Sequence, residues 1–119
     1  MNTNTTTTRM WVWRSDLVET GSIEGFSVEA LDGSIGKIDE ATHDVDGSYI
    51  VVDTGPWIFG KKVLLPAGLI ERVDRSHEQV FVGLTKEQIK NAPEFDEMTY
   101  RDDEYRSSLA DYYSPYLTR

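Results

Sequence analysis

The segment 26–30 (Phe-Ser-Val-Glu-Ala) alternates apolar and polar residues along the chain. A period of two is typical of a strand that buries one face, so a strand is predicted here. It ends at Asp32-Gly33, a dipeptide that favours a tight hairpin turn because glycine adopts positive φ without steric cost. The pattern therefore predicts a β-hairpin.

The returning strand is predicted from Ile35 to His43, and its apolar pattern requires a bulge. Ile35 and Ile38 have opposite parity, so a regular strand would place them on opposite faces. A bulge at Gly36-Lys37 would turn both side chains inward. A second turn at Asp46-Gly47 leads into 48–53, where apolar residues on both faces predict a central strand.

Three further short strands are predicted at 61–65, 69–73 and 79–84, the first of them stopped by Pro66. Thr85 and Gln88 then have the spacing of a capping box, which predicts a helix over 86–91 that Pro93 blocks. The predicted fold class is all-β: a small, strongly curled barrel or sandwich of five to six short antiparallel strands with a capped helix after the last one.

Turns and a bulge explain the glycines of this region better than a ligand does. The residues assigned this structural role are Gly33, Gly36, Gly47, Gly55, Gly60 and Pro66.

Taken in order, these strings resemble the PRC-barrel domain family. The resemblance rests on the hairpin at 25–38 with its Asp-Gly-Ser-Ile-Gly-Lys-Ile string, on Tyr-Ile-Val-Val-Asp-Thr-Gly at 49–55, on 62–66 with 70–73, and on the strand and capped helix at 80–89. It covers about 70 residues. The family includes the barrel modules of the photosynthetic reaction-centre H subunit and of the ribosome maturation factor RimM.

The resemblance implies a non-enzymatic assembly or adaptor module, because the family shares no catalytic motif. The chain is most similar to the stand-alone bacterial members, since it shows neither a membrane anchor nor the companion domain of RimM. Two alternatives stay open: a small-ligand or metal-binding barrel protein, and a RimM-like accessory factor in RNA metabolism.

The amino-acid composition limits the classes of partner that the chain is expected to bind. The 119 residues carry 21 acidic and 12 basic side chains, a formal charge of -9, which disfavours direct binding to nucleic acid or to anionic lipid. No cysteine is present, which excludes disulfides, thiol catalysis and Cys-based metal sites. No apolar run is long enough for a membrane span or a secretory segment, so a cytoplasmic protein is expected. A protein partner with a basic or mixed-charge surface is favoured, and a homo-oligomer, most simply a dimer, is expected.

The chain divides into four parts. Residues 1–9 are a threonine-rich leader predicted to be disordered, and 10–23 form an N-terminal flank. The barrel domain is predicted at 24–93, and 94–119 form an acidic, tyrosine-rich tail.

Candidate chemistry is sparse. His43, Asp44 and Asp46 could hold a divalent cation, but a solvated hairpin tip explains them better, since further oxygen ligands at fixed spacing are missing. His77 lies in a predicted loop without a positioned partner. No catalytic residue, metal ligand or cofactor is therefore assigned.

Aromatic residues give the candidate interaction sites. Trp57, Ile58 and Phe59 lie in a glycine-bounded loop, where they either contact a partner or close one end of the barrel. Trp11 and Trp13 precede the barrel, and packing is favoured over a ligand platform. In the tail, Tyr105, Leu109, Tyr112 and Tyr113 share one helical face. A helix packed over the barrel is favoured there, and an acidic-aromatic docking segment or an arm exchanged between subunits stays open.

Overall fold

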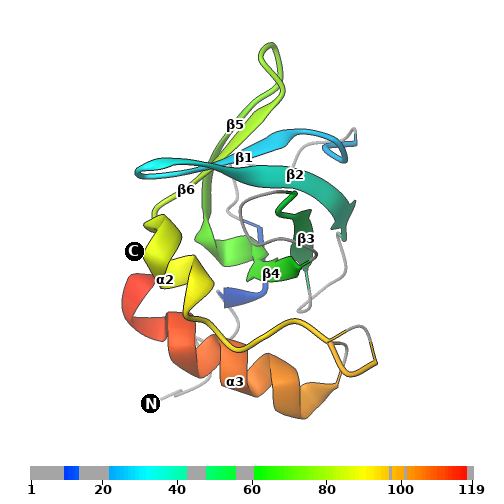
Figure 1. Cartoon of the computed structure of the whole chain (residues 1–119), viewed down its shortest axis with the longest axis vertical. Coiled ribbons are helices and arrows are strands. Elements are labelled where there is room, and N and C mark those ends of the chain that lie inside the picture. The colour runs from blue at the N-terminus through cyan, green and yellow to red at the C-terminus, as the bar shows by residue number, and fades with distance from the viewer. Residues whose placement is uncertain are drawn as a thin grey trace.

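The computed structural model describes residues 10–13, 22–42, 48–55, 61–96, 98–100 and 102–117. Its centre is one six-stranded sheet with the strand order β4-β3-β2-β1-β6-β5 (Figure 1). The mainly β fold class and the number of strands are therefore confirmed. The strands are β1 (Ser27–Ala30), β2 (Gly33–Ala41), β3 (Tyr49–Asp53), β4 (Lys62–Pro66), β5 (Ile70–Asp74) and β6 (Gln79–Val82).

The first hairpin forms where it was predicted, with the bulge in a different position. Ala30 pairs with Gly33 across a two-residue loop, and Gly33 has a φ of +142°. The extra residue of β2 opposite β1 is Ile35, one position before the predicted bulge, and a second register shift against β3 surrounds Asp39. Ile35 and Ile38 are both buried, as the prediction required.

The prediction that all strands are antiparallel is wrong for one pair. β1 and β6 run parallel, with Val28 opposite Val80. Hairpin turns force an antiparallel direction only on strands that follow each other closely in the chain. Because four other strands separate β1 from β6, tertiary packing decided their direction, and both valines are fully buried there.

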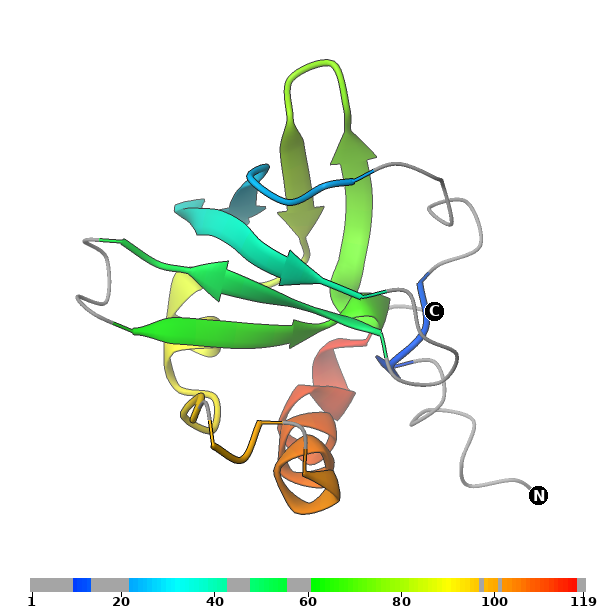
Figure 2. The same cartoon turned by 90° about the vertical axis from the view of Figure 1, so that its right-hand side faces the viewer.

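The sheet is curled but not closed. β4 and β5 are its terminal strands, and no ladder joins them within the described residues. A short 3-10 helix, η2 (Ala67–Leu69), turns the chain directly from β4 into β5. The predicted barrel is thus an open, strongly curved sheet, from which the hairpin of β5 and β6 projects at one end (Figures 1 and 2).

The helices lie on one side of the sheet (Figure 2). The predicted capping box begins α2 (Lys86–Lys90): the Thr85 hydroxyl accepts a hydrogen bond from the Gln88 amide, and the Gln88 side chain accepts one from the Thr85 amide. After it the chain forms α3 (Asp103–Tyr113) and a last 3-10 turn, η3 (Ser114–Tyr116).

The core draws on both flanks as well as on the predicted barrel segment. Trp11 and Trp13 are 5% and 6% exposed, and Leu109 and Tyr113 of α3 are fully buried. All four belong to the same hydrophobic cluster as the sheet residues. The hydrophobic core of the sheet therefore includes residues from outside the predicted barrel domain at 24–93.

Candidate functional site

The predicted helical face of the tail packs inward onto the sheet and α2. Leu109 and Tyr113 are buried, while Tyr105 and Tyr112 are partly buried at its margins. The Tyr112 hydroxyl donates to the carbonyl of Gln88 at 2.6 Å, and the Tyr105 hydroxyl to the carbonyl of Pro93 at 3.4 Å. The structure thus has a helix packed over the sheet, as favoured for this tail.

Tyr113 differs from its neighbours because its hydroxyl has no hydrogen-bond partner among the described residues. Its side chain is 0% exposed, and its ring makes an edge contact with Tyr112 at 5.0 Å between centroids. Burial raises the pKa of Tyr113 above its usual range, so the hydroxyl stays a proton donor. Leaving a buried hydroxyl unpaired costs free energy, which makes this atom unusual in a folded protein.

A cavity of about 260 Å³ lies beside Tyr113, between β4, α2 and the segment that follows α2. Leu64, Ile89 and Tyr113 form its buried part. Val63, Pro93 and Phe95, which are half-buried, extend the apolar wall toward solvent.

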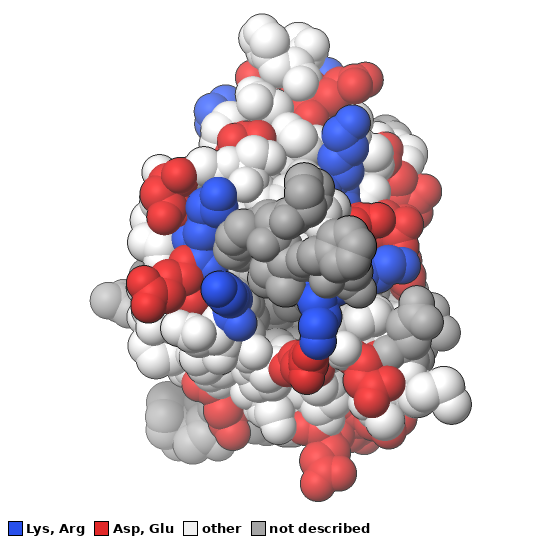
Figure 3. Space-filling model, viewed as in Figure 1, with Lys and Arg blue, Asp and Glu red and all other residues white. Residues whose placement is uncertain are grey.

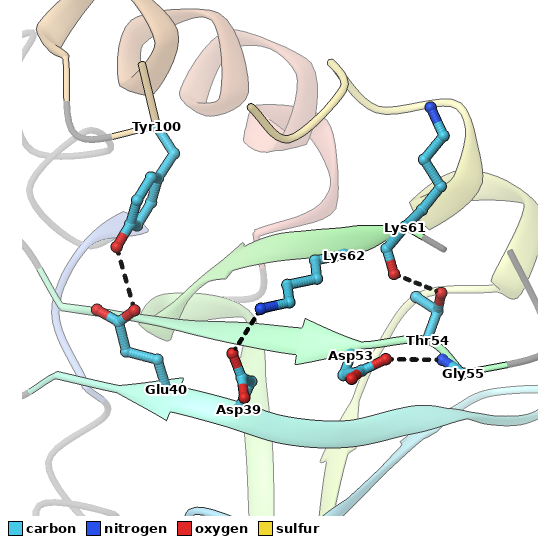
Figure 4. A network of polar contacts seen from close by, with 8 residues as sticks. All are labelled: Asp39, Glu40, Asp53, Thr54, Gly55, Lys61, Lys62 and Tyr100. Carbon is cyan, nitrogen blue, oxygen red and sulfur yellow. Dashed lines mark hydrogen bonds and ion pairs between the residues drawn. The ribbon is translucent and has the colours of Figure 1, made fainter. Parts of the chain in front are cut away.

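Lysines surround the mouth of this cavity. Lys61 forms an ion pair with Glu94, and the Nζ of Lys62 lies 2.9 Å from the Oδ2 of Asp39 (Figure 4). Lys90, at the end of α2, is exposed and has no ion-pair partner among the residues that the structure describes. On the face drawn in Figure 3, basic side chains gather near the middle and acidic ones lie mostly toward the margin.

Next to the cavity, a turn holds Met98 out into solvent. The Asp96 carboxylate accepts a hydrogen bond from the Met98 amide at 2.8 Å, and the Asp96 carbonyl accepts from Thr99 and Tyr100 at 3.0 and 2.9 Å. Met98 is 87% exposed, more than any other large apolar residue in the described part of the chain. Asp96, Asp102, Asp103 and Glu104, which are close to Met98 in the sequence, are all exposed.

Tyr100 anchors this turn to the sheet. Its hydroxyl donates to Glu40 of β2 at 3.1 Å (Figure 4), and the other oxygen of Glu40 accepts from Tyr49 at 3.1 Å. The Tyr100 ring also lies against Phe95, with 4.8 Å between centroids. Burial, and then the charges of Asp96 and Glu94, raise the pKa of Tyr105 nearby to about 12.

The N-terminal tryptophans have packing contacts in the structure. The Trp13 indole N–H donates to the carbonyl of Thr42 at 2.9 Å, and the Trp11 carbonyl accepts from the Ser48 amide at 2.8 Å. The Arg106 guanidinium covers the Trp11 ring from α3. Both rings are enclosed within this chain, so they do not present an open surface.

The structure describes only some of the other residues that the sequence singled out. Trp57, Ile58, Phe59 and Gly60 lie outside the described residues, as do His43, Asp44, Asp46 and Gly47. Gly33, Gly36 and Gly55 have positive φ, in keeping with their predicted structural roles, and Pro66 is the last residue of β4. His77 is exposed and contacts Asp74, whose pKa this hydrogen bond lowers.

The cavity, its lysines and Met98 were missed by the sequence analysis. The walls come from three segments separated along the chain, and no periodic pattern connects them. The one available signal in the sequence was the pair of lysines, Lys61 and Lys62, at the start of an apolar strand. This pair does not indicate a cavity unless the position of α2 beside the strand is known.

Within the described residues, no group of three His, Asp or Glu side chains could hold a metal ion. No helix in that part of the chain is long and apolar enough to cross a membrane.

Comparison with known proteins gives a distant similarity. No protein-family model and no curated protein sequence matches the chain. Among solved structures, the chain is similar to a protein described as a 16S ribosomal RNA processing protein, RimM, from Pseudomonas aeruginosa, with a TM-score of 0.48 and 16% identity. The similar region covers 62% of this chain and 49% of the other, so this chain spans about half of that protein's length. A similarity of this degree concerns the fold alone and transfers no functional residue.

Proposed function

We propose that this protein is a non-enzymatic interaction module of the PRC-barrel type, which docks a protein partner on the acidic segment 96–104. The observation that carries the proposal is Met98, whose side chain is 87% exposed on a turn anchored to the sheet. A large apolar side chain that points outward from its turn contributes little to packing among the described residues, whereas such side chains are common contacts in interfaces.

The charges around Met98 favour a basic or mixed-charge partner. Asp96, Asp102, Asp103 and Glu104 are exposed and lie within six residues of it in the sequence, and the whole chain carries a formal charge of -9. Complementary charges at the rim of an interface accelerate association and select partners, and salt weakens them. The same charge disfavours direct contact with RNA.

Three variants test this role in crosslinked pull-downs from the native cell, quantified by mass spectrometry and followed by affinity measurement with the purified partner. Met98→Ser removes the apolar contact, and D103N with E104Q removes two charges. The control, E24Q with E78Q, changes the net charge equally outside the segment. We expect the first two variants to weaken binding about tenfold, and the control to stay within about twofold of wild type.

Equal capture of every protein by all of these variants would exclude the segment as the docking site. Retention on RNA that falls steeply with salt would instead favour the accessory role in RNA metabolism. The predicted homodimer stays a prediction, and light scattering at several protein concentrations tests it.

A further inference from the structure

We propose that this protein pairs with a second copy of itself, and that Met98 of each protomer enters the cavity between β4 and α2 of the other. The acidic side chains near Met98 then face Lys90 at the mouth of that cavity. The inference rests on the proposed function, because it names the partner that the segment 96–104 binds. Each protomer supplies both halves of the contact.

The cavity can accept an apolar side chain from outside. Its inner wall is buried, and its outer wall is half-buried and leads to solvent; these walls are formed by Leu64 and Ile89, and by Val63, Pro93 and Phe95. An apolar cavity of about 150 Å³ is enough to bind benzene. The volume here, about 260 Å³, therefore has room for a methionine side chain, which has fewer heavy atoms than benzene. Methionine is also unbranched and flexible, so it fits cavities of irregular shape.

Met98 is the matching apolar group, and its turn holds it ready for binding. The side chain is 87% exposed, while the Met98 amide donates to the Asp96 carboxylate at 2.8 Å. On the other side of the turn, the Asp102 amide donates to the carbonyl of Thr99 at 2.9 Å. A side chain on a turn that is already ordered loses less conformational entropy when it binds than one on a flexible segment.

The charges on the two sides of the contact are opposite. The cavity is lined by three lysines and one glutamate: Lys61, Lys62, Lys90 and Glu94. Lys90 is exposed and has no ion-pair partner in the described part of the chain. Asp96 and Asp102, which the hydrogen bonds above join to the Met98 turn, are exposed as well. The turn of one copy and the cavity mouth of another therefore attract each other at short range.

The formal charge of -9 on each copy opposes self-association, and this selects where two copies can meet. Physiological salt screens charges that are farther apart than about 8 Å, so repulsion between distant carboxylates is weakened. Opposite charges in direct contact keep more of their attraction. A lysine-lined cavity therefore suits the acidic Met98 segment better than an apolar surface among further carboxylates would.

The positions of the two halves fit a two-fold dimer. The segment that follows α2 leads from the cavity to the turn (Figure 1), and Met98 comes three residues after Phe95 of the cavity wall. Three residues span at most about 11 Å, so the cavity and Met98 belong to one surface patch. A two-fold axis through such a patch places each Met98 against the cavity of the other copy, which closes the assembly at two subunits.

The test measures association of the full chain by analytical ultracentrifugation from about 10 µM to about 1 mM. We expect a dimer of the wild type within this range, and amide chemical shifts of Leu64 and Ile89 that change with concentration. M98S should weaken dimerisation at least tenfold, to about the level of a missing interface anchor. The control is L31S, which removes another large apolar side chain, 68% exposed, outside the patch, and it should stay within about twofold of wild type.

Variants of the cavity test the other half of the contact. Ala92 is half-buried and lines the cavity, so A92F fills part of it and should weaken dimerisation about tenfold. K90E should weaken it about fivefold, whereas K86E, with the same change of net charge on the same helix but outside the cavity, should stay within about twofold.

A mixture of two variants gives the sharpest result. M98S keeps an intact cavity, and A92F keeps an intact Met98, so one of the two contacts can form only between unlike copies. We expect the mixture to associate about tenfold more strongly than either variant does with itself. Melting curves show whether each variant is folded, and K90E replaces A92F in the mixture if A92F is not.

Three results would overturn the inference: a wild type that stays monomeric at about 1 mM, equal effects of M98S and L31S, or no gain in the mixture. A monomeric wild type that still binds a different purified protein through Met98 would overturn this inference and leave the proposed function in place. If M98S changed neither dimerisation nor the capture of any partner, both proposals would be wrong.

Discussion

The guanidinium carbon of Arg106 lies 4.5 Å from the centre of the Trp11 ring, so the C-terminal helix covers a residue of the N-terminal flank. The same guanidinium is 5.5 Å from the centre of the Tyr49 ring in β3. One side chain therefore joins both flanks to the sheet. Charge and ring attract each other in this arrangement, and the aliphatic part of arginine covers apolar surface at the same time.

Replacing Arg106 should lower stability. We expect R106Q to reduce the free energy of unfolding by about 1 kcal/mol, because the cation–π contacts and the cover over Trp11 are lost. Urea unfolding measures it. The control is R72Q: Arg72 lies 4.0 Å above Phe81, but its side chain is 60% exposed, so a smaller loss of at most about 0.5 kcal/mol is expected. Equal losses would contradict the special role of Arg106.

Removing the tail should abolish cooperative folding. Deletion of 94–119 takes Leu109, Tyr113 and Leu117 out of the core, where they are at most 8% exposed. Loss of each large buried side chain costs about 2–5 kcal/mol, and the total stability of a domain is about 5–15 kcal/mol. Calorimetry should show no cooperative transition, whereas deletion of 1–9 should leave one. A truncated chain with an unchanged melting temperature would disprove the packing role of α3.

Removing the hydroxyl group from each of the adjacent residues Tyr112 and Tyr113 should change the stability of the protein in opposite directions. Y113F should stabilise the protein by about 1 kcal/mol, because it removes a buried polar atom without a partner among the described residues. Y112F should destabilise it by about 1 kcal/mol, because the 2.6 Å bond to the Gln88 carbonyl is lost. Chemical denaturation of both variants checks the signs. A destabilised Y113F would mean that this hydroxyl finds a partner within the protein.

The close contact of β2 with β3 requires a glycine at position 36. Gly36 has a φ of +147°, and a Cβ there would overlap the carbonyl of Asp53 and approach the Thr54 Cα within 2.9 Å. G36A should therefore lower stability by about 3 kcal/mol or prevent folding. G55A is the matched control: its φ is +58° but nothing lies within 4 Å, so only backbone strain of about 1 kcal/mol is expected. Thermal unfolding distinguishes the two.

The buried tyrosines predict a loss of stability at high pH. The pKa of Tyr105 is raised from 10.0 to about 12 in the folded protein, chiefly by burial, and burial also raises the pKa of Tyr113. Above pH 10 the unfolded chain releases these protons while the folded chain holds them, so stability is complete below pH 10 and falls as the pH rises toward about 12. Melting temperatures across this range measure the fall. Y105F should reduce its steepness, and an unchanged slope in Y105F would contradict the assignment.

Local signals in the sequence determined the strands, the first hairpin, the capped helix and the helical tail. Each of these depends on residues close in the chain: the alternation at 26–30, the spacing of Thr85 and Gln88, and the apolar face from Tyr105 to Tyr113. The bulge in β2 was predicted because Ile35 and Ile38 are an odd number of residues apart and would otherwise lie on opposite faces of the strand. The structure places this bulge at Ile35. Such features follow from the sequence because backbone geometry repeats over a few residues.

Only the tertiary structure decided how these parts meet. The parallel pairing of β1 with β6 and the burial of both flanks bring together segments that lie far apart in the chain. The tertiary structure also decided that β4 and β5 are the terminal strands of the sheet and do not pair with each other. The unpaired Tyr113 hydroxyl, the cavity beside it and the partnerless Lys90 arise in the same way. A periodic pattern tells which side of an element is apolar, but the shape of the space between two elements depends on how side chains from distant segments pack, and that is settled only when the whole core forms.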